Sequence, residues 1–558
     1  MNLSWMTPRD LRSRMSKVWD WLLRHKLQLF LALLMVTISV SLRVSPYFMR
    51  QLNFEVGFDT GVYENFMAYY QASESWRGSL PAYPILSPKD QGFVSMMEPA
   101  FFVETGFILR TIDIDMHIFF RYYLPVLVCL LTLPIVYVLG KRLADNYLVG
   151  FAAAALFGIS NLQIEAVNES YYKQIISMVV WFGAIYGFDR YLRGLDRRYF
   201  YPSVLAAGSL FFYHRPASMM LFLLMLVLLI GYVATKNKTA AVSVLKFSAF
   251  SVIVSLPAIL PRLEIELYYG YSFLSGTLRR IGLLGTGQGR IDGGGAIPAV
   301  LQGFDHVLFG YVLVFAPLVL LTTYACYDLW RKKKGSTFIV LFAMLFAYVG
   351  LWFYFGNRII FELDLLVSVL AGYGLVLIAR VLIGTGGDVR TRRTIVIAAL
   401  VSVLVTVASL ALVYQSNKLP YIVNNLDGVN WINENVDTSN SIIFAPAYLS
   451  SNFIQKGYRV ATWDYTLTFG QERPEIAAEE FILEAPSNLS YLESFFDSHP
   501  DYLSLDVLVL WGDRDLQEPL PRSGKFIPFD EYDRSTWFEL SYEGRHEILS
   551  VYRFVSPF

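Results

Sequence analysis

The sequence predicts a polytopic α-helical membrane protein with a small soluble α/β domain at its C-terminal end. Of the 558 residues, 55% are hydrophobic and only 16% are charged, and the mean hydropathy is +0.44, which is high for a soluble protein. Apolar runs long enough to cross a bilayer, roughly 17 to 25 residues each, recur up to residue 415. From residue 417 onward the composition is that of a soluble domain. We therefore expect a membrane domain over 1–416 and an α/β domain over 417–558.

About eleven transmembrane helices are expected from the apolar runs. They lie at 28–44, 118–140, 147–163, 173–189, 201–213, 216–234, 244–261, 307–327, 337–354, 358–380 and 394–415, and the fifth of them is shorter than a full span. A basic segment precedes the first run, but no small-residue cleavage site follows it, which favours a retained span over a signal peptide. Cys129 and Cys326 both fall inside apolar runs, so no disulfide framework is expected.

Basic residues recur on every second connection, as the positive-inside rule requires. The residues that define this side are Arg9, Arg12, Arg14, Lys17, Arg24 and Lys26, then Lys141 and Arg142, then Arg190, Arg193, Arg197 and Arg198, then Lys236 and Lys238, then RKKK at 331–334, then Arg390, Arg392 and Arg393. We expect a cytoplasmic N-terminus and an extracytoplasmic C-terminal domain. Large outer loops are expected at 45–117 and 262–306, and the compact shorter connections favour a prokaryotic plasma membrane.

The C-terminal segment alternates helical and strand patterns. VNWINENV and AYLSSNFIQ are typical of helices, whereas SIIFAP and DVLVLWG are typical of short buried strands. WFELSYEGRHEILSVYRF has two β-rich runs around a Glu-Gly turn and predicts a terminal hairpin.

Ionisable side chains gather on the connections of the outer face. Such groups at a membrane are costly when unpaired and indicate function. They are Asp59, Tyr63, Glu64 and Glu98 in the first outer loop, Glu165, Glu169 and Lys173 before the fourth span, and Arg358, Glu362 and Asp364 at the outer end of the tenth. Glu169 with Lys173, and Arg358 with Glu362, have the i,i+4 spacing of ordinary helical ion pairs, which is the alternative interpretation.

Asp59 lies in VGFDTGVYENFMAYY, a segment suited to the membrane surface because its aromatic residues match headgroup level. A carboxylate there can accept the proton of an acceptor hydroxyl as that oxygen attacks a sugar. The alternative is that Asp59 caps a helix.

A cation facing this carboxylate would stabilise a phosphate leaving group. Lys173 and Arg358 are the first candidates, and Arg279 and Arg280 in the second large outer loop are the next. An arginine suits bidentate phosphate binding, although Arg358 also fits a side chain that extends to the lipid headgroups.

His214 and Arg215, in an HRP turn on the outer side, either contact phosphate or end a short helix, and we expect no catalytic role for them. The sequence holds no HExxH motif, and its two cysteines form no CxxC pair. We expect either no cofactor or Mg²⁺ or Mn²⁺, in which case Asp59 and Glu169 would be the ligands. Basic and acidic residues both number 46, which gives no indication of nucleic-acid binding.

Together these features resemble the type-C fold (GT-C) of membrane glycosyltransferases that use lipid-phosphate sugars. The superfamily includes protein O-mannosyltransferases, aminoarabinose transferases of lipid A and oligosaccharyltransferases. The segments that carry the resemblance are GFDTGVY at 57–63, MEPAFFVETGFIL at 97–109, NESYYK at 168–173 and NRIIFELDLLVSVLAGYGL at 357–375. Asp59 is a single acidic residue where the O-mannosyltransferases have adjacent ones, and Trp463-Asp464-Tyr465 only partly matches the Trp-Trp-Asp motif of oligosaccharyltransferases.

The resemblance implies an inverting transferase that moves a sugar from a polyprenyl or dolichyl phosphate to an acceptor hydroxyl on the outer face. Asp59 would be the general base, Glu169 an accessory acid, and Lys173 and Arg358 the groups that bind the donor phosphate. Tyr63, Glu98, His214 and Arg215 are candidate substrate contacts, and the acceptor would be a glycan, lipid or protein. Three alternatives stay open: an oligosaccharyltransferase-like enzyme, a transporter or channel with an extracellular domain, and an inactive sugar-binding relative.

Overall fold

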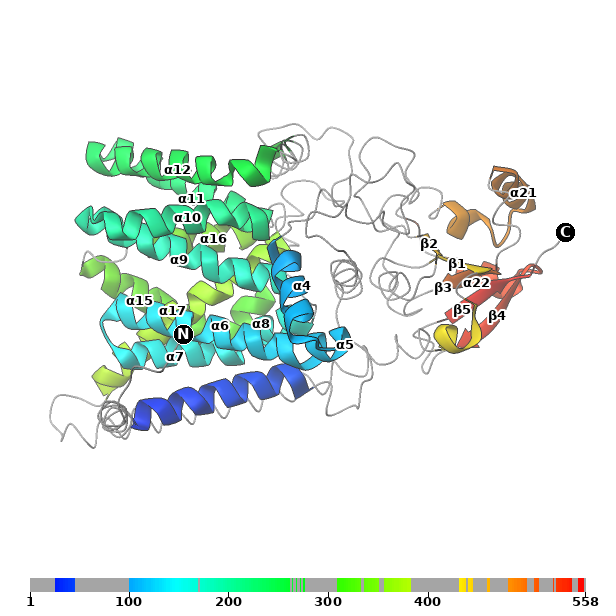
Figure 1. Ribbon diagram of the computed structural model, residues 1–558, viewed down its shortest axis with the longest axis horizontal. Coiled ribbons are helices and arrows are strands. Elements are labelled where there is room, and N and C mark those ends of the chain that lie inside the picture. Colours follow the sequence, from blue (N-terminus) through cyan, green and yellow to red (C-terminus); the bar gives the residue numbers. More distant parts are fainter. Residues whose placement is uncertain are drawn as a thin grey trace, which may run out of the picture.

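The computed structural model describes two regions, a helical bundle and a small mixed sheet (Figure 1). The described residues are 26–45, 100–168, 171–260, 263, 267, 271, 274–275, 309–332, 336–350, 356–382, 431–437, 440–444, 459–461, 480–498, 506–510, 525, 528–543 and 550–555. The run at 394–415, the boundary near 417 and the AYLSSNFIQ segment lie outside them.

The bundle follows the predicted spans closely. It opens with an apolar helix, Lys26–Ser45. The following elements are α4 (Ala100–Ile112), α5 (Met116–Ile118), the π-helical turn η2 (Phe119–Tyr123), α6 (Leu124–Ala144), α7 (Tyr147–Ile159), α8 (Asn161–Asn168), α9 (Tyr172–Gly194), α10 (Arg197–Tyr213), α11 (Arg215–Ala234), α12 (Lys238–Ile259), α15 (Phe309–Arg331), α16 (Ser336–Gly350) and α17 (Gly356–Leu382).

Six helices in the described part are long and apolar enough to cross a membrane. They are Lys26–Ser45, Phe119–Ala144, Tyr172–Gly194, Arg215–Ala234, Lys238–Ile259 and Ile359–Val381. Tyr147–Ile159 and Thr337–Gly350 are shorter apolar helices. The prediction of a polytopic helical membrane protein is confirmed, whereas the number eleven stays a prediction.

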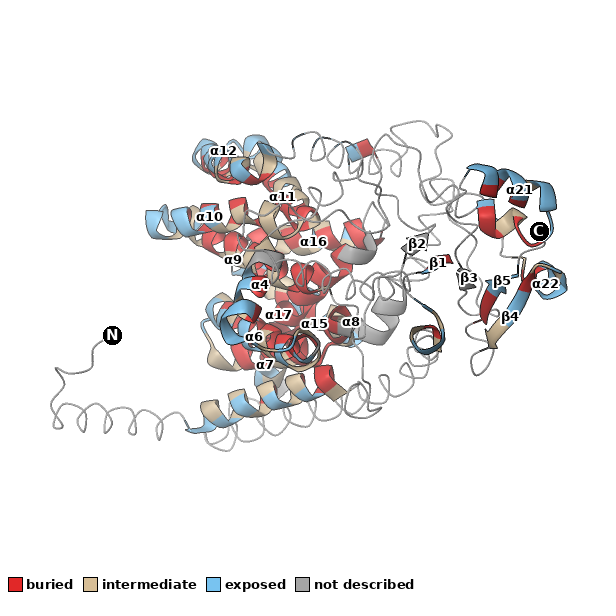
Figure 2. Ribbon diagram, turned by 45° about the vertical axis from the view of Figure 1, so that its right-hand side comes forward, coloured by how far each residue is buried: buried red, intermediate tan, exposed pale blue. Residues whose placement is uncertain are grey.

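The bundle is built around α17. This helix packs against α7, α15 and α16, and 94% of its apolar window is buried (Figure 2). The outer helices carry exposed apolar side chains, among them Leu33, Leu205, Ile230 and Ile253, on the surface that would face lipid. Cys129, in α6, is buried, and neither Cys129 nor Cys326 is in a disulfide.

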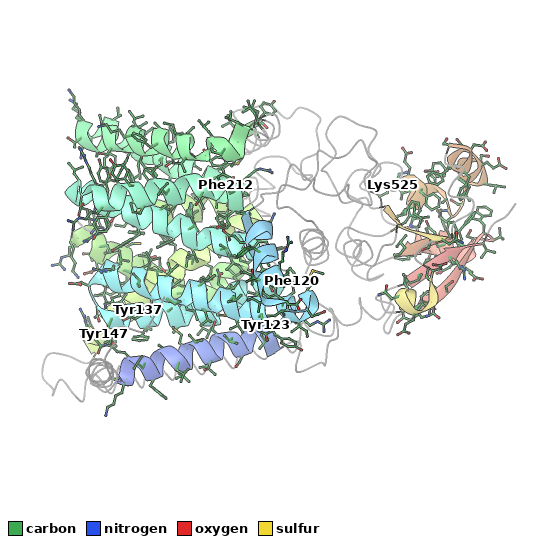
Figure 3. The ribbon with its side chains drawn as sticks, in the orientation of Figure 1. Phe120, Tyr123, Tyr137, Tyr147, Phe212 and Lys525 are labelled. Atoms are coloured by element: carbon green, nitrogen blue, oxygen red, sulfur yellow. The ribbon has the colours of Figure 1, made fainter. Side chains whose placement is uncertain are left out.

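Aromatic residues mark both ends of the bundle. Tyr137 and Tyr147 lie at one end, where α6 meets α7, and Phe120, Tyr123 and Phe212 lie at the other (Figure 3). Because aromatic side chains favour the lipid headgroup level, the two sets are consistent with the two surfaces of a bilayer. The second end also holds α4 and α8, and the sheet lies beyond it (Figure 1).

The C-terminal region holds a five-stranded sheet of order β2-β1-β3-β5-β4. The strands are β1 (Ser441–Phe444), β2 (Arg459–Ala461), β3 (Asp506–Leu510), β4 (Phe538–Glu543) and β5 (Ser550–Phe554). β1 is parallel to β2 and β3, and β5 is antiparallel to β3 and β4. Both predicted strands and the antiparallel pairing of the terminal hairpin are confirmed, and β1 is buried as predicted.

Helices pack against this sheet, and all four residues of β1 are buried. Residues 431–435 are helical, as predicted, and α21 (Leu489–Ser498) and α22 (Phe529–Arg534) are further helices. Ile442 and Phe444 of β1 pack with Phe481, Phe495 and Tyr532, whereas Ile443 between them belongs to a different cluster. The alternation follows from the two-residue repeat of a strand.

Candidate functional site

Of the candidate residues, Lys173, His214 and Arg215 have described side chains. For Arg358 the backbone lies in the first turn of α17. Asp59, Tyr63, Glu98, Glu169, Arg279 and Arg280 lie outside the described residues. Their roles therefore stay predictions, and the described part of the site is the corner formed by α7, α8, α9 and α17.

This corner interrupts what the apolar pattern presents as one long span. α7 ends at Ile159, Ser160 is extended at φ −61° and ψ 125°, and the eight-residue α8 follows. The expected span 147–163 is thus too long: its last residues belong to a separate short helix. The reason is chemical, because Ser160 and Gln163 introduce buried polar groups here instead of continuing an apolar surface.

The alternative interpretation of Glu169 and Lys173 as an i,i+4 ion pair stays a prediction, because Glu169 lies outside the described residues. Tyr171 lies outside both helices, with φ −76° and ψ 41°, and α9 begins only at Tyr172. Lys173 therefore lies in the first turn of α9. Arg358 and Glu362, by contrast, are both in α17, as their spacing predicts.

Two carboxylates of α17 are fully buried beside this corner, Glu362 and Asp364, each 0% exposed. The side-chain amide of Gln174 donates to both oxygens of Glu362, at 3.2 Å to Oε1 and 3.0 Å to Oε2. Asp364 Oδ2 accepts from Ser160 Oγ at 2.8 Å and from Gln163 Nε2 at 3.0 Å. Hydrogen bonds of this kind offset part of the cost of burying a carboxylate.

Aromatic contacts hold the start of α9 from two sides. The Tyr171 ring meets Phe361 of α17 edge to face, with centroids 5.8 Å apart. The Tyr172 ring stacks on Phe101 of α4 at 6.2 Å and lies 6.2 Å from Phe120. The first turn of α9 is therefore packed between α17 and α4.

Lys173 follows directly and is 9% exposed. A lysine so nearly buried among apolar helices is unusual, because its ammonium group needs polar partners or a partial route to solvent. Its place in the first turn of α9 puts it at the end of the bundle that holds α4 and α8 (Figure 1).

His214 separates two helices. Its backbone is extended, at φ −161° and ψ 109°, and its N–H donates to the Leu210 carbonyl at 2.8 Å, so it caps α10 before α11 begins. This agrees with a helix-ending role. Arg215 beside it is buried, at 6% exposure, and the preceding Tyr213 donates a short hydrogen bond to Glu104 of α4.

The opposite end of α9 holds a different buried carboxylate. Asp189 is 3% exposed and pairs with Arg193 at 2.5 Å, one helical turn away. The two ends of α9 thus differ: one has a charge pair within the helix, and the other has contacts to α17 and α4.

No group of three or more His, Cys, Asp or Glu side chains able to hold a metal ion occurs among the described residues. Asp59 and Glu169, the expected metal ligands, are not among them.

The bundle and the sheet together define a polytopic membrane protein with the GT-C fold. The crystal structure of ArnT from Cupriavidus metallidurans bound to undecaprenyl phosphate is similar, with a TM-score of 0.55 and 12% sequence identity, covering 96% of this chain and 99% of that chain. The apo structure of ArnT gives a TM-score of 0.52 at 12% identity, covering 97% and 100% of the two chains. No protein-family model matches the chain, and no curated protein matches its sequence.

Proposed function

We propose that this protein is a membrane glycosyltransferase that takes a sugar from a polyprenyl phosphate and transfers it, with inversion, to an acceptor hydroxyl on the extracytoplasmic face. The supporting observation is the likeness to ArnT bound to undecaprenyl phosphate, which extends over 96% of this chain and so includes both the bundle and the sheet. A fold alone does not define a reaction, so the residues at the corner also support the proposal.

The proposed chemistry uses two kinds of residue. Asp59 accepts the proton of the acceptor hydroxyl while that oxygen bonds to the anomeric carbon of the sugar. The bond between this carbon and the phosphate oxygen breaks, and the polyprenyl phosphate leaves with an additional negative charge. Lys173 and Arg358 stabilise that charge, and Glu169 assists as an accessory acid or, if a metal is used, as its ligand.

The position of Lys173 supports this division of roles. A nearly buried cation at the end of a membrane helix can meet a lipid phosphate without leaving the headgroup level. Arg142, Arg193 and Arg198 belong to the other end of the bundle, which suits the cytoplasmic side. In this arrangement the C-terminal sheet and the corner share the extracytoplasmic side.

The experiment is release of free polyprenyl phosphate from a panel of polyprenyl-phosphate sugars, with membrane extract as acceptor. Purified wild type is compared with Asp59→Asn, and Glu64→Gln serves as the matched control because it removes a neighbouring carboxylate. We expect release by wild type and by the control, and a loss of at least about a hundredfold in Asp59→Asn, the scale of losing a general base.

Equal release by wild type and Asp59→Asn would move the base to Glu169 or Glu98. The absence of release from every donor would contradict the proposed reaction. Flux of a substrate into liposomes without sugar transfer would then favour the transporter alternative.

A further inference from the structure

One turn of α17 contacts both ends of the segment that leads into Lys173. Asp364 binds Ser160 and Gln163 at the beginning of that segment. Glu362 binds Gln174 at its end. Phe361 contributes at both ends, because its carbonyl accepts from Gln163 Nε2 at 3.1 Å and its ring contacts Tyr171.

These contacts fix the backbone of Lys173 relative to that of Arg358. Lys173 directly precedes Gln174, which Glu362 holds. Arg358 lies four residues before Glu362 on the same helix, about 6 Å along its axis. Both positions therefore lie near the same end of the bundle.

Stability alone does not explain this choice of residues. Apolar side chains could pack α8 against α17 at lower cost than two fully buried carboxylates. Carboxylates and amides, however, form directional bonds of fixed geometry, whereas apolar contacts tolerate sliding. A cation site for a phosphate needs such fixed geometry, since a displacement of about 1 Å can cost a hundredfold in rate.

We propose that Glu362 and Asp364 are positioning residues that fasten α8 and the first turn of α9 to α17, so that Lys173 and Arg358 meet the same donor phosphate. This inference rests on the proposed function, because it takes Lys173 and Arg358 as the phosphate-binding pair. It adds that the alignment of this pair is set by Gln163 and Gln174, two neutral residues with no catalytic chemistry of their own.

The test compares Glu362→Ala with a reversed pair, Gln174→Glu combined with Glu362→Gln, in which the amide and the carboxylate exchange places. Asp189→Asn is the matched control, since it removes a buried carboxylate at the far end of α9, the helix that holds Gln174. Two quantities are measured on the full-length protein: hydrogen exchange of the backbone amides of residues 161–175, and kcat and KM for the polyprenyl-phosphate donor.

We expect Glu362→Ala to accelerate exchange in residues 161–175 and to raise the donor KM about tenfold, as for the loss of a well-aligned contact. The reversed pair should restore both quantities. Asp189→Asn should alter neither. If Glu362 acts through Lys173, Glu362→Ala should raise KM less than about twofold when Lys173 is already methionine.

An equal tenfold effect in the Lys173→Met background would overturn the positioning role, as would an equal effect of Asp189→Asn. Unchanged exchange in Glu362→Ala would show that the first turn of α9 is not fastened to α17 in this way. A wild type whose backbone amides exchange as expected but which transfers no sugar would refute the proposed function. The phosphate-aligning role of Glu362 and Asp364 would then fall with it, whereas their contacts that hold α8 and α9 against α17 would still stand.

Discussion

Arg43 Nη1 donates a 2.7 Å hydrogen bond to the carbonyl of Gly158 and so joins the first described helix to the last turn of α7. The same nitrogen donates to Ser39 Oγ at 2.6 Å and to the Ser39 carbonyl at 3.1 Å. Arg43 is only 3% exposed, and the partial negative charge at the C-terminal end of α7 attracts its guanidinium group. This contact lies directly before Ser160, where the corner begins.

We predict that Arg43→Ala destabilises the protein by roughly 1–3 kcal/mol, because the Gly158 carbonyl loses a charged donor inside the bundle. Ser39→Ala, which removes one of the three acceptors, should cost less. The measurement is the apparent unfolding temperature in detergent. An Arg43→Ala protein as stable as wild type would mean that another group satisfies this carbonyl.

Close helix packing gives a second prediction. A methyl group on Gly372 of α17 would lie 2.6 Å from the Ala153 nitrogen, and one on Gly374 would lie 2.2 Å from the Leu321 carbonyl. Backbone atoms cannot move aside as a flexible side chain can. Gly372→Ala and Gly374→Ala should each destabilise the bundle by about 1–3 kcal/mol in a detergent unfolding assay.

Gly183 is the matched control for these two, because nothing lies within 4 Å of its added methyl group. Gly183→Ala, in the middle of α9, should be neutral or stabilising by up to about 1 kcal/mol. Equal losses at all three positions would argue against glycine-mediated contact of α17 with α7 and α15.

The sequence predicts the helices of the bundle much better than the corner. Apolar runs identify α9, α11, α12 and α17 to within a few residues, because the bilayer imposes a length and a hydropathy on each. α8 is missed because it is only eight residues long and follows α7 after the single residue Ser160. The partners of Glu362 and Asp364 are neutral residues 188 to 204 positions away, and such amides and hydroxyls carry no sequence signal. Of the candidate site residues, Lys173, His214 and Arg215 are compared with the structure in side-chain detail.

The soluble domain allows a prediction about pH. Tyr532 is buried, and its hydroxyl donates to the Ile482 carbonyl at 3.0 Å. Burial raises the pKa of Tyr532 well above its usual value of 10.0. The neutral side chain therefore contributes stability fully below about pH 10, the pKa of an unfolded tyrosine, and the contribution is lost as the pH rises through the folded pKa.

The chain has 36 tyrosines, so this effect requires a difference measurement. The tyrosinate absorbance of wild type minus that of Tyr532→Phe, followed from neutral to alkaline pH, should show no ionisation of Tyr532 in the ordinary range near pH 10. Ionisation should instead accompany the loss of β-sheet circular dichroism at higher pH. A difference titration centred near pH 10 in the folded protein would contradict the burial of this hydroxyl.

The last prediction separates the two cations of the proposed phosphate site. Lys173→Met keeps most of the apolar stem but removes the charge, so it should lower kcat/KM for the polyprenyl-phosphate donor about a hundredfold or more, the scale of losing one preorganised stabilising group. Lys173→Arg should keep part of the activity, because it retains the charge with a different donor geometry. Arg358→Lys should lose more than Lys173→Arg if Arg358 binds the phosphate in a bidentate manner. If Lys173→Arg and Arg358→Lys lose equal amounts of activity, and both variants unfold at the wild-type temperature, each residue would act only as a source of positive charge.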